Sequence, residues 1–372
     1  MFTFFFIEPR PRPLIMAPMA KSITYSQAGV DIDASDQWTD VIKGMVRKTY
    51  GPRVLSGVGG FAGLFRLDYD EKIFQRNYRK PVLVACTDGV GTKILIAKDA
   101  RKLDTVGIDL VAMNVNDMVV TGAEPLLFLD YMAVGRLDPA SAVELLKGIT
   151  EGCRQSDCSL IGGETAEMPD LYDHEEFDLA GFAVGVVELK KIIDGRKVRP
   201  GDTLLGLASS GLHSNGFTLV RKIMFDVLGH KLDDQLPGFG CTVAEELLRP
   251  TKIYVKPILQ TLRKYKIKQP IRAMAHITGG GLVGNLPRVL PPNCAAVIHT
   301  DAWPTPKIFD YLQTKGPVTW SEMFRVFNMG IGLVLVVRPA FANAVAEFLA
   351  KRGETVYKIG RIKAGKPEVE LR

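Results

Sequence analysis

Residues 87–93 bring together side chains that could bind a phosphate and its metal ion. The segment reads Thr-Asp-Gly-Val-Gly-Thr-Lys and follows apolar residues 81–86, which are typical of a strand. Glycines allow a backbone to approach a ligand closely, and a helix starting near Thr92 would point its positive end at the same place. Asp88 is a suitable ligand for Mg²⁺, and Lys93 could contact a transferred phosphate. The segment matches neither a Walker A loop nor a Rossmann fingerprint, so an ordinary connection is the alternative.

A second acidic group lies on one face of a helix expected over residues 108–121. At about 100° per residue, Asp109, Asn116 and Asp117 fall within roughly 100° of one another, opposite an apolar face. The helix would end at Gly122, with a proline three residues later. Carboxylates beside a defined turn suit Mg²⁺, whereas the wheel alone equally fits an ordinary solvated face.

Two glutamates follow the apolar residues 159–161, which are expected to form a strand. Glu164 and Glu167 are three residues apart, so a continuing strand would put them on opposite faces. A turn could instead bring both toward the acidic residues. We predict that at least one of them is a magnesium ligand.

Two histidines precede segments that could hold a phosphate. His213 comes before a hydroxyl and an amide that could cap the next helix or contact a phosphate at its start. His276 stands just before a glycine triplet, for which a phosphate contact is favoured over a bare hinge. A lone histidine is more often structural, so acid–base or substrate-binding roles for both are hypotheses. The residues expected at the substrate phosphate are Ser214, Asn215, Gly279, Gly280 and Gly281.

Length and composition place these motifs in an ordinary globular protein. At 372 residues the chain is long enough for two domains. Hydrophobic residues make up 47% and charged residues 24%, and the net charge of +6 comes from dispersed lysines and arginines. Because no basic stripe with interleaved aromatic residues is present, we expect anion sites for phosphorylated ligands and no nucleic-acid partner.

The cysteines and the N-terminus bear on the compartment. Five cysteines without zinc-binding spacing predict free thiols, a reducing environment and a cytoplasmic protein. Residues 1–6 are apolar but too few to span a membrane, and prolines and arginines follow them. Neither a signal peptide nor a membrane partner is therefore expected. Residues 1–20 are predicted to be a disordered leader or to precede the true start.

Alternating strand and helix patterns predict a two-domain α/β fold. A charged stretch at 190–202 containing Pro200-Gly201 predicts the boundary, so that the domains cover residues 21–190 and 191–372. A first helix is expected at 38–48, and the glycine-rich loop at 57–63 is either a lid or a mobile connection. Strands are expected at 82–86, 126–134, 159–161, 179–187, 203–208, 271–275, 295–299, 332–337 and 355–362. Helices are expected at 92–100, 108–121 and 139–156, and beginning near 215, 251, 282, 306, 321 and 339.

The segment from Asp117 to Pro125 fits the Asp-x4-Gly-Ala-x-Pro signature and so resembles the PurM-like ATP-binding superfamily. From about residue 25 to about residue 362 the chain is similar to the phosphoribosylformylglycinamidine cyclo-ligase (AIR synthetase) family. It departs at Leu212, where that family commonly has proline. The resemblance rests on seven ordered blocks, at 25–33, 87–93, 107–113, 162–169, 209–216, 276–281 and 327–332.

The resemblance implies a fold and a reaction. ATP would activate the formyl amide oxygen of formylglycinamidine ribonucleotide, and an amidine nitrogen would then close the imidazole ring of 5-aminoimidazole ribonucleotide. ADP and phosphate would be released, and Mg²⁺ would accompany the ATP. The first domain would pair across a homodimer to build a barrel-like sheet with ATP near the interface. The second would be an α/β domain with a mixed sheet.

The same resemblance implies roles for individual residues. Lys43, on the first helix, matches a lysine placed near ATP, although a solvated helix lysine is an equal alternative. The implied nucleotide-binding residues are Asp88, Gly89, Gly91, Thr92, Lys93, Asp109, Asn116, Asp117 and Gly122. The implied metal ligands are Asp88, Asp109, Asp117, Glu164 and Glu167. The catalytic candidates are Lys43, Asp88, Lys93, His213 and His276.

Other members of the superfamily fit less well. Selenophosphate synthetase would need a reactive cysteine in the early glycine-rich loop, and the hydrogenase-maturation relative would need one at the C-terminus; both are absent. Formylglycinamidine synthase would be much longer. Thiamine monophosphate kinase shares the acidic nucleotide residues and is the best enzymatic alternative, while a nucleotide-binding regulator is the non-enzymatic one.

Overall fold

The computed structural model describes residues 43–56, 63–66 and 78–372. The predicted leader at residues 1–20 and residues 57–62 of the glycine-rich loop lie outside these ranges. Residues 43–46 are helical and continue into the 3₁₀ helix η2 (Arg47–Thr49), as expected for the described part of the first helix. Two short strands, β1 (Val54–Ser56) and β2 (Leu64–Phe65), then pair with each other.

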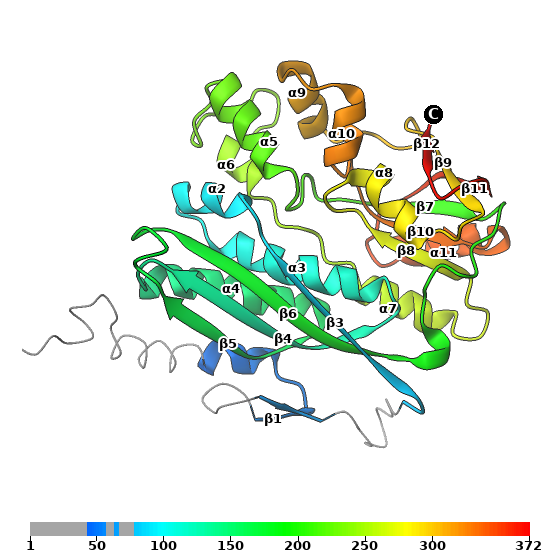
Figure 1. The fold of residues 1–372 in the computed structure, drawn as a ribbon, viewed down its shortest axis with the longest axis horizontal. Coiled ribbons are helices and arrows are strands. Elements are labelled where there is room, and N and C mark those ends of the chain that lie inside the picture. The colour runs from blue at the N-terminus through cyan, green and yellow to red at the C-terminus, as the bar shows by residue number, and fades with distance from the viewer. Residues whose placement is uncertain (1–42, 57–62, 67–77) are drawn as a thin grey trace, which may run out of the picture.

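The first domain is built on an open sheet of four strands (Figure 1). Their spatial order is β3 (Pro81–Gly89), β6 (Phe177–Glu188), β4 (Glu124–Val134) and β5 (Ser159–Glu167). Within this sheet β3 and β4 run antiparallel to β6, whereas β4 and β5 are parallel. The crossover between these parallel strands is a helix, as parallel pairing requires.

One face of this sheet is covered by α3 (Asp104–Val119) and α4 (Pro139–Ser156), and the short helix α2 (Lys93–Asp99) follows β3. The two long helices approach closely because Gly148 has no side chain, and a Cβ there would overlap the backbone of Asp104. Helix α4 begins where the Asp138 carboxylate accepts the Ser141 N–H at 3.0 Å, and it ends at Asp157 in the left-handed region.

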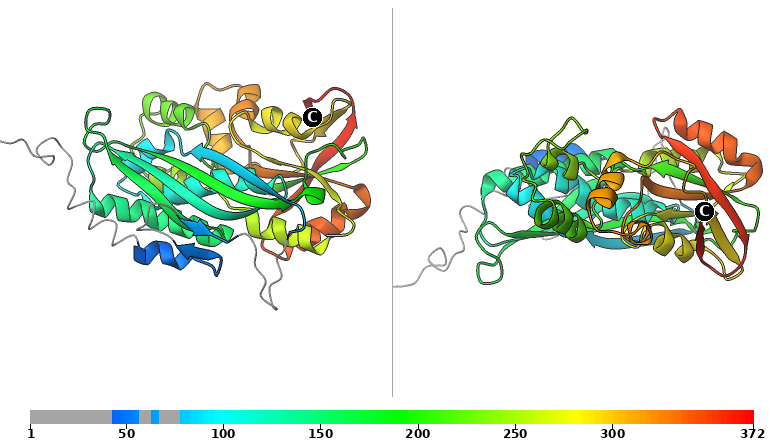
Figure 2. Two further views of the ribbon diagram at one scale, coloured as in Figure 1. Left: turned by 60° about the horizontal axis from the view of Figure 1, so that its bottom comes forward. Right: turned by 90° about the horizontal axis from the view of Figure 1, so that it is seen from above.

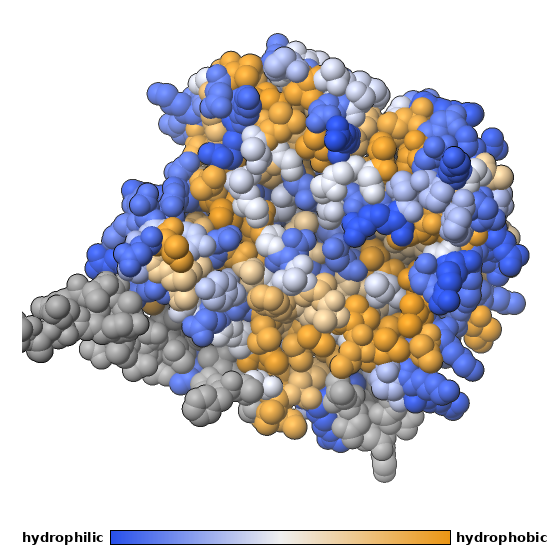
Figure 3. Space-filling model, in the orientation of Figure 1, coloured by the Kyte–Doolittle hydropathy of each residue, from blue (hydrophilic) through white to orange (hydrophobic). Residues whose placement is uncertain are grey.

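The other face of the sheet is apolar and open in the single chain. Along β3, alternate side chains point toward α3 and toward solvent, as in any strand covered on one face. Leu83 is 60% exposed and Phe182 on the neighbouring β6 is 43% exposed. Figure 3 shows apolar side chains gathered over these strands. Closure of this sheet into a barrel by a second copy stays a prediction.

The second domain carries a six-stranded mixed sheet with helices packed around it. The strand order is β12 (Val369–Leu371), β9 (Cys294–Ile298), β11 (Val356–Ala364), β7 (Thr203–Ala208), β10 (Ile331–Val337) and β8 (Ile271–His276). All seven residues of β10 are buried, which explains its unbroken apolar sequence. The predicted two-domain α/β fold with a mixed second sheet is confirmed.

Its helical segments are mostly short. They are α5 (Phe217–Arg221), the π-helical η4 (Lys222–Val227), α6 (Val243–Leu247), α7 (Val255–Lys264), α8 (Gly281–Asn285), η5 (Leu286–Val289), α9 (Lys307–Lys315), α10 (Trp320–Val326), η6 (Pro339–Phe341) and α11 (Ala342–Ala350). In the described residues, no helix is both long and apolar enough to cross a membrane.

The chain passes between the sheets after β6, through η3 (Leu189–Lys191), and enters the second sheet at Thr203. The two sheets lie toward opposite ends of the molecule (Figure 2), and α3 lies between the first sheet and the second domain. Its surfaces therefore pack both on β3 and β6 and on α7 and β8 of the second domain. Because α3 is buried by both domains, its polar residues lie at the junction between them, where the candidate site is found.

Candidate active site at the domain junction

Three side chains from three elements lie near one another where α3 passes between the domains. Asp88 comes from the end of β3, Asp117 from the last turn of α3, and His276 from the end of β8. The His276 Nδ1 lies 2.8 Å from the Asp117 Oδ1, and the side chain of Asp117 is 45% exposed. Asp88 accepts the backbone N–H of Gly89 at 2.8 Å. We call these three residues the acidic cluster.

The carboxylates of the acidic cluster influence each other. Burial raises the pKa of Asp88, and the negative charge of Asp117 raises it further, while the Gly89 N–H and His276 act in the opposite direction. Burial, together with the charge of Asp117, also raises the pKa of the Cys86 thiol to about 12. A cation bound here would relieve this repulsion.

The acidic cluster could hold a magnesium ion only together with further ligands that the described part of the chain does not supply. Among the described residues, no three His, Cys, Asp or Glu side chains form a complete metal site. Mg²⁺ commonly takes one or two protein carboxylates together with phosphate oxygens and water. Asp88 and Asp117 therefore suit a metal ion that arrives with a nucleotide, and not a resident ion held by protein alone.

Asp109 and Lys93, which the sequence placed in the same site, form a sealed ion pair instead. The Lys93 Nζ lies 2.7 Å from the Asp109 Oδ2, and both side chains are completely buried. The other oxygen of Asp109 accepts the backbone N–H of Thr251 at 2.7 Å and its hydroxyl at 2.6 Å. In this structure Asp109 therefore has no oxygen open to a metal ion.

The ammonium group of Lys93 is equally occupied. Besides Asp109, it donates to the backbone carbonyls of His213 at 3.0 Å and Arg249 at 2.7 Å. Burial lowers the pKa of Lys93, and the Asp109 carboxylate opposes that change. With all three donors used inside the protein, contact with a transferred phosphate would require this ion pair to open. The residue instead fastens α2 to two loops of the second domain.

Asn116 is also used at the junction. It accepts the backbone N–H of Tyr254 at 2.9 Å and donates to the carbonyl of Lys252 at 2.8 Å. Neither Asn116 nor Asp109 has any exposed surface, so the solvated-face interpretation of this helix was wrong for both. The second domain covers the polar face of this helix. A helical wheel of one segment contains no information about such packing by another domain.

The turn that carries the predicted phosphate contacts begins later in the sequence than expected. Strand β3 continues through Gly89, and Gly91 then takes a φ of +70° before helix α2. The Thr92 hydroxyl lies 3.1 Å from that of Thr218 in the second domain. Gly122, with a φ of +86°, closes the end of α3 against the linker. These positions are consistent with the predicted nucleotide contacts, which stay predictions.

His213 is buried in the loop between β7 and α5, with a φ of +63°. Its Nε2 accepts the backbone N–H of Ser210 at 3.2 Å, and its Nδ1 has no hydrogen-bond partner among the described residues. Burial lowers the pKa of His213 well below its usual value, and the positive charges of His276, Lys93 and Lys252 add to this. The ring is therefore neutral at pH 7.

The two segments predicted at the substrate phosphate are adjacent. A Cβ on Gly279 would lie 3.6 Å from the Asn215 side-chain oxygen. The Ser214 hydroxyl donates to the carbonyl of Val90 at 3.1 Å, so this segment also contacts the turn after β3. Gly280 and Gly281 both have positive φ, and a Cβ on Gly281 would overlap the backbone of α10.

The structure does not bring the two glutamates to the acidic cluster. Strand β5 continues through Glu167, so the proposed turn between them was wrong and the two side chains lie on opposite faces. The Glu167 carboxylate accepts the backbone N–H of Leu137 at 2.7 Å. Strands β3 and β5 are at opposite edges of the sheet, about 14 Å apart by ordinary strand spacing. Within one chain, the two glutamates therefore lie at the edge of the sheet opposite Asp88, and their role as magnesium ligands stays a prediction.

The helix that carries Lys43 likewise lies near β5, at the edge of the sheet opposite Asp88. This helix continues into η2, which packs against α4 and β5. The carbonyl of Thr49 at the end of η2 accepts the Ser159 hydroxyl at 3.0 Å. A role for Lys43 near ATP stays a prediction, and the described contacts place it away from this chain's acidic cluster.

Two residues that organise the junction were not identified from the sequence. Thr251 resembled an ordinary helix start, but it is bound to Asp109 and lies outside the helix, since α7 begins only at Val255. Asn328 makes hydrogen bonds to the carbonyls of Gly211 and Leu212 at 2.9 and 3.2 Å, which hold the loop before His213. No local signal indicates either role.

Asp130 is a further residue near the site, and the sequence does contain a signal for it. It is an acid inside an otherwise apolar strand, and it pairs across β6 with the same residue, Gly181, that pairs with Asp88. Burial raises the pKa of Asp130 to about 7. It therefore lies in the same cross-strand row as Asp88.

The chain matches known families over both domains. Residues 72–187 match the AIR synthase related protein N-terminal domain, and residues 199–372 match the corresponding C-terminal domain. Among solved structures, a thiamine-monophosphate kinase from Stenotrophomonas maltophilia has a TM-score of 0.63 at 19% identity, covering 88% of this chain and 94% of that one. The hydrogenase maturation protein HypE in complex with ATP has a TM-score of 0.57 at 15% identity, covering 88% of both chains. At such identities the likeness establishes the fold alone, which is that of the AIR synthase related proteins.

Curated relatives give a narrower assignment. A phosphoribosylformylglycinamidine cyclo-ligase of Citrifermentans bemidjiense is 53% identical over 352 residues, covering 94% of this chain and 98% of the relative. One from Thermodesulfovibrio yellowstonii is 50% identical over 344 residues, covering 92% and 97%. The chain belongs to the phosphoribosylformylglycinamidine cyclo-ligase family.

Proposed function

We propose that this protein catalyses the ATP-dependent closure of formylglycinamidine ribonucleotide to 5-aminoimidazole ribonucleotide. ADP and phosphate are the other products, and the enzyme is a ligase of purine biosynthesis. The observation that carries the proposal is the match of about half of all residues over nearly the full length of relatives with this activity in their names. The acidic cluster and the adjacent loops of the second domain supply a site that suits it.

The reaction needs charge neutralisation and positioning more than a covalent nucleophile. ATP transfers its terminal phosphoryl group to the formyl amide oxygen, which becomes a leaving group when the amidine nitrogen attacks that carbon. Asp88 and Asp117 would hold the magnesium ion of the nucleotide, and that ion would neutralise charge on the transferred group. His276 contacts Asp117 at 2.8 Å and so orients its carboxylate.

The substrate side of the site is supported by the loops before α5 and α8. Asn215 and Gly279 are adjacent there, and Gly279 is exposed. Backbone N–H groups of a glycine-rich turn suit the ribose 5′-phosphate. The sealed Lys93–Asp109 pair would position these loops against the turn after β3 without contacting substrate.

We also propose that two copies pair through the open face of the first sheet. Exposed apolar residues on this face, Leu83 and Phe182, support this. Leu83→Asp together with Phe182→Asp is expected to give a monomer in sedimentation velocity, whereas Ile267→Asp, at a position 83% exposed elsewhere, leaves the dimer intact. A wild-type monomer at micromolar concentration would contradict this pairing. The five free thiols further support a reducing compartment, the cytoplasm.

The test of the proposed activity is ADP release that depends on the second substrate. Purified protein with ATP and Mg²⁺ is expected to release ADP and form the imidazole product only when formylglycinamidine ribonucleotide is added. Thiamine monophosphate serves as the alternative acceptor, because thiamine-monophosphate kinase shares the fold. ADP release with thiamine monophosphate but not with the formylglycinamidine substrate would overturn the proposal.

A further inference from the structure

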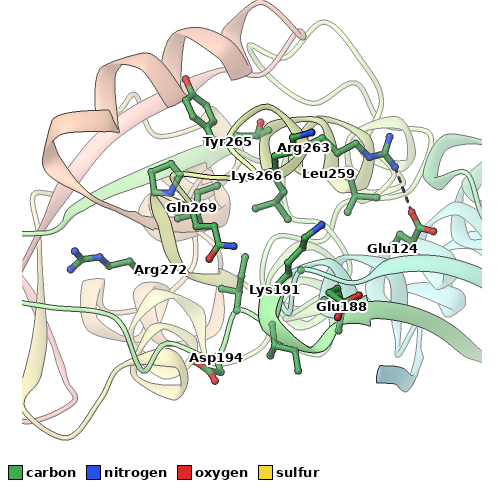
Figure 4. A pocket seen from close by; sticks show the side chains of 18 of the residues that line it. Glu124, Glu188, Lys191, Asp194, Leu259, Arg263, Tyr265, Lys266, Gln269 and Arg272 are labelled. Atoms are coloured by element: carbon green, nitrogen blue, oxygen red, sulfur yellow. Dashed lines mark ion pairs between the residues drawn. The ribbon is translucent and has the colours of Figure 1, made fainter. Parts of the chain in front are cut away.

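A cavity of about 430 Å³ lies between the two domains, and none of the acidic cluster lines it. Its walls come from the linker after β6 and from α7 with the turn that follows it (Figure 4). Small-molecule sites usually measure about 300–1,000 Å³, so the volume suits one small ligand. The apolar lining residues include Ile192, Ile193, Leu259, Leu262 and Pro270.

The cations around this cavity are not all paired. Among the described residues, Lys191, Lys197 and Lys266 line the cavity without an ion pair or a side-chain hydrogen bond. In Figure 4, Lys191 and Gln269 point toward the middle of the cavity from opposite walls. Three lysines around one opening leave positive charge there, which an anion bound between them would balance.

The remaining charged groups of the wall are engaged with charged neighbours or with backbone. The Asp194 carboxylate accepts the Arg196 side chain at 2.6 Å. Arg263 lies 3.5 Å from Glu124, as the dashed line in Figure 4 marks, and Arg272 lies 2.9 Å from Asp202. The Glu188 carboxylate accepts the backbone N–H groups that precede β3. The unengaged charge at the cavity is therefore positive.

We propose that this cavity is a second ligand site, for a small organic anion that joins a phosphate, sulfonate or carboxylate group to a flat apolar body. The isoleucine and leucine side chains would bury the apolar body, since removal of apolar surface from water is favourable. Lys191 and Lys266 would hold the anionic group, and the Gln269 amide could donate to it. The site is separate from the acidic cluster and does not rest on the proposed reaction.

The position of the cavity connects it to the catalytic residues. Strand β8 begins in the cavity wall at Ile271 and ends at His276, while the chain that carries Asp117 reaches the wall at Gly122. A ligand touching both the linker and α7 would favour this arrangement of the domains over others. Its binding would therefore be coupled to the geometry between Asp117 and His276.

The test uses two fluorescent probes on the full-length protein. 8-Anilinonaphthalene-1-sulfonate carries an anion on a flat apolar body, and N-phenyl-1-naphthylamine has nearly the same body without the charge. The double variant Lys191→Met/Lys266→Met keeps the apolar stems and removes two charges. We expect it to weaken binding of the sulfonate probe about tenfold and to change that of the uncharged probe less than twofold.

Two further variants separate this site from probe bound elsewhere. Lys315→Met, at an exposed position on α9, is the matched control and is expected to leave both affinities within twofold of wild type. Ile193→Trp fills the cavity and is expected to remove the fluorescence of both probes that comes from the cavity. Fluorescence from probe bound at the open apolar face of the first sheet should remain. Melting temperatures near that of the wild type show that each variant is folded.

Three results would overturn the proposal. The first is an unchanged affinity for the sulfonate probe in the Lys191→Met/Lys266→Met variant. The second is an equal loss for both probes in that variant, which would leave charge without a role. The third is displacement of the sulfonate probe by ATP with Mg²⁺ from the wild type but not from Asp117→Ala, which would place the probe at the catalytic nucleotide site. None of these measurements requires turnover, so their outcome is independent of the proposed activity.

Discussion

Asp109 and Asp117 lie on the same helix about two turns apart, yet their surroundings are opposite. Asp109 is completely buried and is satisfied by Lys93 and Thr251. The side chain of Asp117 is 45% exposed and contacts His276. The second domain covers the middle of α3 and leaves its last turn at the edge of the junction.

The difference shows how one helix can carry both a structural and a functional carboxylate. A buried carboxylate whose oxygens are all engaged has nothing left for a metal ion, and its ion pair instead fixes the elements around it. An exposed carboxylate held by one histidine is oriented and still has acceptor capacity. The residue type is the same, and the covering domain decides the role.

The largest expected effect comes from breaking the sealed pair. Lys93→Met leaves the Asp109 carboxylate buried without its cation, and we expect the free energy of unfolding to fall by about 3–5 kcal/mol. Denaturant unfolding followed by circular dichroism measures the change. The double variant Lys93→Met/Asp109→Asn, which removes the unpaired charge and keeps a side-chain oxygen for Thr251, should recover part of the loss. A single-variant loss of under about 1 kcal/mol would show that the pair is not the anchor we describe.

Asp117→Ala should separate function from stability. Because the side chain is half in solvent, we expect the melting temperature to change little. Turnover should fall about 10²–10³-fold, as is typical when one group that stabilises transition-state charge is removed. Steady-state ADP release measures this, with Asp226→Ala at an exposed position as the control. Wild-type activity in Asp117→Ala would rule out its role with the metal ion.

A pH series tests the buried surroundings of the sealed pair. His213 is neutral when folded, since its pKa is far below the value of about 6.5 that it has in the unfolded chain. The unfolded state therefore binds an extra proton below about pH 6.5, and stability falls as the pH decreases. This group should therefore lower the free energy of unfolding as the pH falls from 7 to 5.

The variant His213→Asn should show a shallower decrease over that range. Asparagine tolerates the positive φ at this position, so the loop is kept. His174→Asn, at an exposed position, is the matched control and should keep the wild-type slope. Identical slopes for His213→Asn and the wild type would contradict a buried neutral imidazole.

The smallest effect is expected at an exposed ion pair on α4. Lys147 pairs with Glu144 three residues earlier, and both side chains are about half exposed. Lys147→Met should change the free energy of unfolding by less than about 0.5 kcal/mol, because solvent screens such pairs. A cost comparable to that of Lys93→Met would mean that burial does not explain the difference between the two pairs.

Much of the fold could be predicted from the sequence because its signals are local. Apolar runs such as that of β10, and the cap formed by Asp138 and Pro139 before α4, act within a few residues. Strand β12 was missed because it is three residues long and is held by pairing with β9, whereas α6 was missed although Thr242 and Glu245 form a capping box at its start. Strand β5 was predicted too short, since its glycine- and glutamate-containing end pairs with β4 despite an unfavourable composition.

For the candidate site, the sequence by itself determined which residue types were available: the aspartates, the glycine turns and the two histidines. Only the tertiary structure decided their use. It sealed Asp109 and Lys93, joined Asp117 to His276 across 159 residues of sequence, and left Glu164 and Glu167 at another edge of the sheet. The physical reason is that exposure and partnership depend on which surface of the second domain covers each side chain, and residues distant in sequence set that surface.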